Sequence, residues 1–185
     1  MGIPGLLKEL PGGTMADSCF SFSKLIELQD TKDPIDIDSS TLVFLCALKY
    51  KDTYKAGNYI PAVPKFHRQI IVLDLVYKWK YTCIFDGCPP AEKAHEHRRH
   101  SEKEDSIRIN STCIAMHVII CKRCFVKYTV APTEADMQVG RRNKSTIVVC
   151  RDSDEVAYGN KYIVMVDSYS KEAYRIIDTN QPNTE

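Results

Sequence analysis

The sequence predicts an α/β fold with a mainly parallel sheet flanked by helices. Short β-rich apolar runs, such as 81–85, alternate along the chain with amphipathic segments of helical length, such as 66–80. Strands separated by helices favour a parallel sheet that is covered on both faces. With 185 residues, of which 44% are hydrophobic, the chain can bury one sizeable core. We therefore expect a single domain over residues 1–185.

Apolar runs and turn residues place the expected elements in order. The amphipathic segment 3–10 ends at a Pro-Gly-Gly turn, and a short strand further on ends at Asp38. After it we expect, in chain order, a helix at 41–50, a loop at 57–64, a helix at 66–80, a strand at 81–85 and a polar stretch with little core at 91–110. A helix at 111–125 and a strand at 127–132 follow, and then a helix that opens at Thr133 with Glu134 and Asp136 in its first turn. The last expected elements are a strand at 145–150, a turn at 151–154 and a strand at 161–167. In such a sheet the ligand site lies beyond the carboxyl ends of the strands.

Six carboxylates lie in three clusters, each next to an apolar run that is typical of a buried strand. A crowd of buried carboxylates is tolerable only if protons or cations neutralise the charge, and oxygen ligands suit hard divalent ions. Two such ions, roughly 3.5–4 Å apart, are the usual means of attacking a phosphodiester with water. The sequence therefore predicts a metal-dependent phosphodiesterase that uses two Mg²⁺ or Mn²⁺ ions. The six residues are Asp38, Asp86, Glu134, Asp136, Asp152 and Asp154.

Composition permits this function without pointing to it. The net charge is +1 and the pI is near 7.5, so any attraction of nucleic acid must come from local clusters of charge. The eight cysteines lie partly inside apolar strands, and the chain has neither an apolar signal segment nor a stretch of membrane length. We expect a reducing, intracellular setting and no membrane partner.

Five sequence blocks, in this order, resemble the flap endonuclease, exonuclease and XPG family of structure-specific 5′ nucleases. They are MGIPGLLKEL (1–10), IDIDSS (35–40), IFDGCPPAEK (84–93), VAPTEADMQ (130–138) and DSDEVAYG (152–159). Any one block is a weak signal, but five in the family's order are highly specific. The resemblance spans most of the chain, from Met1 to about Asp167.

The resemblance implies a PIN-like nuclease fold, with an amino-terminal nuclease block at 1–100, a shortened helical arch at 91–110 and an internal nuclease block at 128–167. It implies hydrolysis of DNA with 5′ flaps, nicks or ends by a two-metal mechanism, in DNA repair or replication in the nucleus. It also implies roles for individual residues: the six carboxylates hold the metals, with Asp86 and Asp154 central to catalysis; Lys93, Arg98 and Arg99 reach the scissile phosphate; Gly2 lies near the active site; and Phe44 stacks on the nucleotide beside the scissile bond.

Three departures from the family pattern bear on the substrate. The segment between Asp86 and Glu134 is shorter than the family's arch region, and Arg151 stands where an acidic residue usually precedes DSD. The chain also ends at Glu185, before the helix-two-turn-helix that grips duplex DNA and carries a further aspartate. We therefore expect weak, salt-sensitive binding, or a protein partner that replaces the duplex-binding region. The cations that remain are Lys93, Arg98, Arg99, Arg141 and Arg142.

Two alternatives stay open. A protein can keep a nuclease fold and lose turnover, which would leave a nucleic-acid-binding or scaffold protein, with RNA as well as DNA among its partners. Separately, the spacing of Cys113, His117, Cys121 and Cys124 is loosely that of a zinc site. These four residues lie in a run that predicts a helix, where a closed tetrahedral site would need a reversal of the chain, so the zinc interpretation is disfavoured.

Overall fold

The computed structural model covers the sheet, most of its helices and the loops between them. It describes residues 35–71, 80–93, 107, 109–142, 147–150, 152, 155, 158–160, 162–168 and 173–178. Several predicted features lie outside these residues, including the amphipathic segment 3–10 and most of the shortened arch at 91–110. No described helix is long and apolar enough to cross a membrane.

Six strands form one sheet in the order β3-β2-β1-β4-β5-β6. The first five run parallel, and β6 pairs antiparallel with β5. The predicted mainly parallel α/β fold is therefore confirmed. The strands are β1 (Ile35–Asp38), β2 (Tyr81–Phe85), β3 (Lys127–Val130), β4 (Ile147–Cys150), β5 (Tyr162–Ser168) and β6 (Ala173–Asp178).

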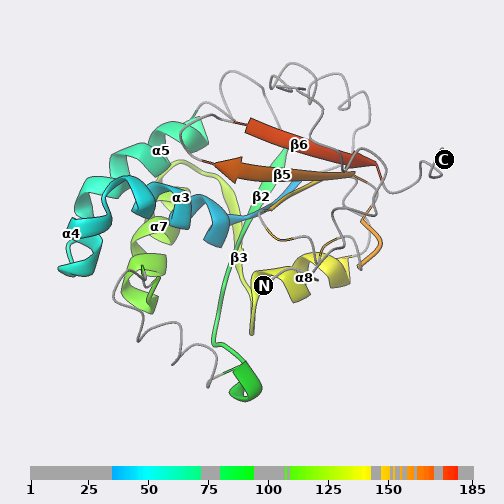
Figure 1. The fold of residues 1–185 in the computed structure, drawn as a ribbon, viewed down its shortest axis with the longest axis horizontal. Coiled ribbons are helices and arrows are strands. Elements are labelled where there is room, and N and C mark those ends of the chain that lie inside the picture. The colour runs from blue at the N-terminus through cyan, green and yellow to red at the C-terminus, as the bar shows by residue number, and fades with distance from the viewer. Residues whose placement is uncertain are drawn as a thin grey trace.

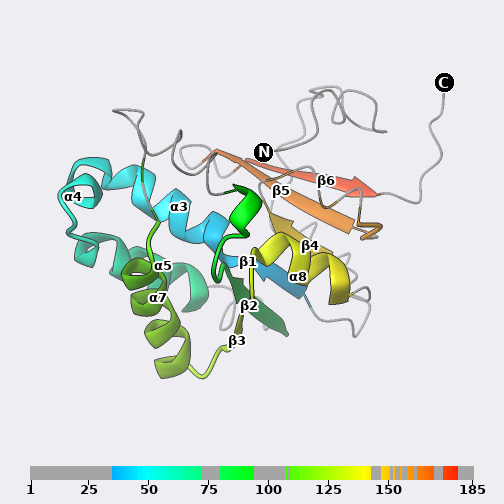
Figure 2. The ribbon, with the colours of Figure 1, turned by 90° about the horizontal axis from the view of Figure 1, so that it is seen from below.

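The helices cover both faces of this sheet. On one side lie α3 (Ser39–Lys49), α5 (Val63–Ile71) and α7 (Ser111–Arg123), with the short α4 (Lys51–Lys55) after α3; on the other lies α8 (Ala135–Arg142) (Figures 1 and 2). Each side buries its own apolar cluster. The larger cluster includes Ile35, Phe85 and Cys121, and the smaller one, under α8, includes Ile84 and Val139.

The alternation of side chains along β1 explains why an acid is buried in the sheet. Ile35 and Ile37 face the larger cluster, so Asp36 and Asp38 face the side that α8 covers. The partner of Asp38 in the parallel register is Ile84, which belongs to the cluster under α8. Asp38 is only 6% exposed, and it ends the strand at the base of α8.

The structure corrects four details of the predicted elements. The loop expected at 57–64 is shorter, because a 3-10 helix, η1 (Ile60–Ala62), leads into α5, which holds Pro64 in its first turn, where proline is tolerated. α8 begins at Ala135, so Glu134 precedes the helix. The polar stretch 91–110 contributes Ile107 and Ile109 to the margin of the core, and it begins with a 3-10 helix, η3 (Ala91–Lys93). The antiparallel strand β6 was not predicted.

Candidate active site

A pocket of about 450 Å³ opens where four parallel strands end. Asp38 ends β1, Asp86 follows β2, Glu134 follows β3 and Asp152 follows β4. The chain passes from β1 to β2 on one side and returns to β4 on the other, which places the pocket at the point where the strand order reverses. The lining residues are Asp38, Ser40, Thr41, Phe44, Asp86, Ile109, Glu134, Asp136 and Asp152.

Asp38 is held rigidly as the N-cap of α3. Its Oδ1 atom accepts hydrogen bonds from the backbone N–H groups of Ser40 (3.0 Å) and Thr41 (3.4 Å), and its Oδ2 accepts the Thr41 hydroxyl at 2.6 Å. An aspartate at this position satisfies amide groups that have no partner within the helix. The same contacts fix the direction in which the carboxylate faces the pocket.

Asp86 joins two loops that are far apart in the sequence. Its Oδ1 accepts a hydrogen bond from the backbone N–H of Ala135 at 2.8 Å, and its own N–H donates to the Ser40 hydroxyl at 3.2 Å. The next residue, Gly87, donates its N–H to the Thr133 carbonyl at 2.6 Å. A Cβ at position 87 would overlap the carbonyl oxygen of Ala131, so only glycine fits there. The DG turn thus fixes the loop that carries Glu134.

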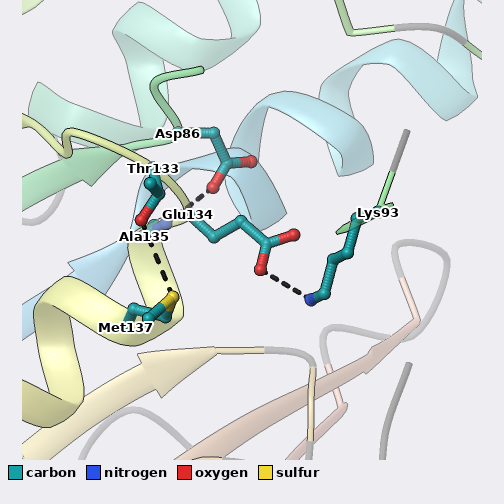
Figure 3. A network of polar contacts seen from close by, with 6 residues as sticks. All are labelled: Asp86, Lys93, Thr133, Glu134, Ala135 and Met137. Carbon is teal, nitrogen blue, oxygen red and sulfur yellow. Dashed lines mark hydrogen bonds and ion pairs between the residues drawn. The ribbon is translucent and has the colours of Figure 1, made fainter. Parts of the chain in front are cut away.

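Glu134 and Lys93 form an ion pair at the mouth of the pocket (Figure 3). The Lys93 Nζ lies 2.6 Å from Glu134 Oε2, and the two side chains are 46% and 18% exposed. Figure 3 shows the Lys93 side chain extending towards the carboxylate of Glu134. A lysine predicted to contact the scissile phosphate is therefore paired with one of the predicted metal ligands.

The acids of the pocket raise one another's pKa. Burial raises the pKa of Asp38 to about 8, and the charges of Asp136 and Asp86 add to the effect. Burial also raises the pKa of Asp136 to about 6, helped by Asp86, Asp152 and Glu134. Carboxylates brought this close resist ionising together, and perturbed pKa values of this kind cluster at functional sites.

Sequence reasoning missed one acid of this group, Glu155. Its side chain is fully buried, and the pKa is raised to about 8 by burial together with Asp136 and Asp38. Asn160 donates its Nδ2–H to Glu155 Oε2 at 2.7 Å, whereas Glu155 Oε1 is buried without a hydrogen bond among the described residues. The sequence signal that could have identified Glu155 is its position directly after the DSD motif. However, an acid followed by Val-Ala is equally typical of a solvated turn.

The donor atoms suit a hard divalent ion, since every titratable group that lines the pocket offers carboxylate oxygens. The buried, unpaired Oε1 of Glu155 next to these acids is a further acceptor that a cation or its water can satisfy. Within the described residues, however, no three histidine, cysteine or acidic side chains meet closely enough to form a complete ligand set. Asp154, the sixth predicted ligand, lies outside those residues.

The structure gathers most of the predicted site residues into this pocket. Phe44, the predicted stacking residue, lines it and is half-buried. Four predicted site residues lie outside the described residues, and their roles stay predictions: Gly2, Arg98, Arg99 and Asp154.

The structure gives the four residues of the zinc alternative other surroundings. Three of them, Cys113, His117 and Cys121, are buried in α7 on the opposite side of the sheet from α8. His117 Nδ1 lies 2.7 Å from the backbone carbonyl of Cys113, the usual contact one helical turn back, and the described residues form no metal-binding group there. All of the described cysteines are free thiols.

No family model and no curated protein matches the sequence, but solved structures share its fold. The chain has a PIN-like α/β fold, which it shares with a Rad2 catalytic core and a flap endonuclease. The catalytic core of Rad2 in complex with DNA substrate is 20% identical with a TM-score of 0.59, over 87% of this chain and 54% of that one. Flap endonuclease-1 from Methanococcus jannaschii is 17% identical with a TM-score of 0.62, over 88% of this chain and 60% of that one. The chain thus spans about half the length of these structures.

Proposed function

We propose that this protein is a divalent-metal-dependent nuclease that hydrolyses phosphodiester bonds in DNA. The observation that carries the proposal is the meeting of acids from the ends of four parallel strands in one pocket, where Asp38 and Asp136 have raised pKa values. Folding brings charges together at this density only where a cation or protons offset the repulsion. The shared fold with nucleases supports the same conclusion.

Each residue of the pocket has a distinct task in this proposal. Bound at the acids, two Mg²⁺ or Mn²⁺ ions would supply an activated water and stabilise the leaving oxygen. Asp38, Asp86, Glu134 and Asp136 hold one ion directly or through water, and Asp152 with Asp154 holds the other. Lys93, at the mouth of the pocket, offsets the negative charge that builds on the phosphate.

The proposed substrate is DNA with a 5′ flap, nick or end, in repair or replication. Phe44 and Ile109 give the acidic pocket an apolar margin on which a base beside the scissile bond can rest. Duplex binding is shared with a protein partner or with further sequence, since the chain matches about half of each related structure.

The second candidate function is a nuclease fold without turnover that binds nucleic acid as a scaffold. Its support is the local use of the carboxylates: Asp38 caps α3, Asp86 accepts from Ala135, and Glu134 is paired with Lys93. Acids that make such structural contacts could remain after activity was lost.

A metal titration followed through thermal unfolding separates the two functions. A working site gains stability with Mg²⁺ or Mn²⁺ by mass action, and the gain should disappear in Asp136→Asn. The same preparations should be tested on labelled flap, nicked and blunt DNA. Metal-dependent stabilisation together with cleavage supports the nuclease. No shift in melting temperature and no cleavage by the wild type, with DNA binding retained, supports the scaffold.

A further inference from the structure

A strained, exposed aromatic residue lies at the far end of β3 from the active site. Phe125 has a φ of 57° and is 97% exposed. A bulky residue with a left-handed backbone is a genuine outlier, because its Cβ crowds the following carbonyl. Phe125 therefore carries two unfavourable features at once, backbone strain and an aromatic ring in water.

The local hydrogen bonds show which residue the fold would prefer there. Val126 donates its N–H to the Cys121 carbonyl at 2.9 Å, and Phe125 donates to the Lys122 carbonyl at 3.3 Å. This pair of bonds is the Schellman motif that ends α7, and Phe125 occupies the position at which glycine is usual. Glycine would relieve the strain, so the side chain of Phe125 must serve something other than the helix end.

Other exposed apolar side chains lie within six residues of Phe125 along the chain. Ile119 on α7 is 51% exposed and Tyr128 on β3 is 36% exposed. At about 1.5 Å of rise per helical residue and 3.3 Å per strand residue, these two side chains lie at a similar level on either side of the turn. Tyr128 is in register with Cys83, whose side chain belongs to the cluster on the α7 face of the sheet. Figure 2 shows α7 turning directly into β3.

Three cations flank these apolar groups in the sequence, and no acid occurs in the same segment. Lys122, Arg123 and Lys127 are all exposed. No aspartate or glutamate occurs between Asp105 and Glu134, in a chain whose net charge is only +1. We name Ile119, Lys122, Arg123, Phe125, Lys127 and Tyr128 the α7–β3 corner.

We propose that the α7–β3 corner binds single-stranded nucleic acid, with bases stacked on Phe125 and Tyr128 and phosphates beside Lys122 and Arg123. Alternating cations and aromatic rings are the chemistry that holds an unpaired strand. An acidic protein segment could pair with the same cations, but it does not offer the π-face that every nucleobase presents to an aromatic ring. A base needs only the flat face of the ring.

The corner lies within reach of a strand that also enters the active site. The extended chain from Phe125 to Glu134 can span no more than roughly 30 Å. At about 3.4 Å per nucleotide along one strand, fewer than about ten nucleotides cover that separation. The proposal nevertheless concerns binding alone and holds whether or not the pocket is active.

Phe125→Gly tests the proposal because its effects on stability and on binding should have opposite signs. The affinity of the full-length protein for fluorescein-labelled dT₂₀ is measured by anisotropy in EDTA, so that cleavage plays no part. Phe125→Gly should raise the melting temperature and weaken dT₂₀ binding about fivefold or more, the lower end for losing one stacked base. Phe125→Trp should restore binding. Ile60→Ala, which removes a 69% exposed apolar side chain from η1, is the control and should leave affinity unchanged.

The cations are tested through salt dependence. Lys122→Ala/Arg123→Ala should lower the magnitude of the log–log salt slope for dT₂₀ by about 1.4, since each phosphate contact on a single strand contributes about 0.7. Lys49→Ala/Lys55→Ala removes the same charge from exposed positions of α3 and α4 and should leave the slope unchanged.

Two results would overturn the proposal. One is unchanged dT₂₀ affinity in both Phe125→Gly and Lys122→Ala/Arg123→Ala. The other is polyglutamate binding as tight as dT₂₀ binding and equally weakened by Phe125→Gly, which would assign the corner to an acidic protein segment. Neither result bears on metal-dependent cleavage at the pocket, so the two proposals fail separately.

Discussion

The Oδ1 atom of Asp86 accepts a hydrogen bond from the backbone N–H of Ala135 at 2.8 Å, the residue with which α8 begins. The side chain of one loop therefore caps a helix that starts 49 residues later in the sequence. Because α8 carries Asp136, the same bond sets the distance between two acids that raise each other's energy when ionised.

Two substitutions of Asp86 should distinguish the effect of its hydrogen bond with Ala135 on stability from the effect of its negative charge on cleavage. Asp86→Asn keeps an oxygen acceptor for Ala135, so we expect stability to be retained while metal-dependent cleavage is lost. Asp86→Ala also removes the cap, which should cost about 0.5–2 kcal/mol, partly offset by relief of repulsion with Asp38 and Asp136. Chemical denaturation and a flap-cleavage assay measure the two effects. Full cleavage by Asp86→Asn would contradict the catalytic role.

The stability of the metal-free protein should fall as the pH rises from 5 to 8. The folded-state pKa values of Asp38 and Glu155 are raised to about 8 and that of Asp136 to about 6, well above the unfolded values near 4. Between these limits the folded state binds more protons than the unfolded state. The stability from these groups is therefore complete below about pH 4 and is lost as the pH rises through the folded pKa values.

Melting curves at several pH values, with and without Mg²⁺, test whether stability falls as the pH rises. Metal ligands must be deprotonated, so the stabilisation by Mg²⁺ should grow over the same pH range. Asp38→Asn, which keeps an N-cap acceptor, should show a shallower fall with pH in EDTA. If the melting temperature in EDTA rises from pH 5 to 8, the folded state does not bind more protons than the unfolded state in this range, and the prediction is wrong.

Much of the fold could be predicted because its signals are local. Strand 81–85 is a β-rich run bounded by turn residues, and it forms β2 as expected. Asp38 could be placed at a strand end because a short apolar strand stops there. The antiparallel strand β6 was missed, because it is stabilised by its pairing with β5 and not by a hydrophobic periodicity that is visible in its own sequence.

The sequence predicted which residues form the site better than it predicted how their side chains are arranged. Five of the six acids proposed from the sequence are described, and all five line one pocket. The sequence could not show that carboxylate oxygens of Asp38 and Asp86 accept hydrogen bonds from the first residues of α3 and α8, because those bonds depend on where the helices begin. Burial of Glu155 was equally hidden, since its hydrogen bond from Asn160 depends on how the chain turns after β4.

Lys93→Ala should lower the single-turnover rate more than the affinity. A charge that meets the phosphate best in the transition state acts on rate, and the partly exposed pair with Glu134 adds little stability. Rates and dissociation constants on a 5′-flap and on a nicked duplex test this, with Lys93→Arg as the variant that keeps the charge. Lys93→Ala at the wild-type rate would show that the lysine only pairs with Glu134.

Gly87→Ala should disturb the fold and the metal site together. A Cβ there overlaps the Ala131 carbonyl oxygen and must push apart the end of β2 and the loop that carries Glu134. Overpacking of this kind costs typically about 1–3 kcal/mol. Gly57→Ala is the matched control: its φ of 78° also disfavours alanine, but a Cβ there meets open space.

Thermal unfolding in EDTA and in Mg²⁺ distinguishes these two glycines. At roughly 2–4 °C per kcal/mol for a chain of this size, Gly87→Ala should lower the melting temperature by about 2–12 °C and also shrink the Mg²⁺-dependent gain, because Glu134 and Asp136 move away from Asp86. Gly57→Ala should lower the melting temperature and leave the gain intact. An undiminished gain in Gly87→Ala would mean that the contact between the DG turn and the Ala131–Thr133 loop does not position the acids.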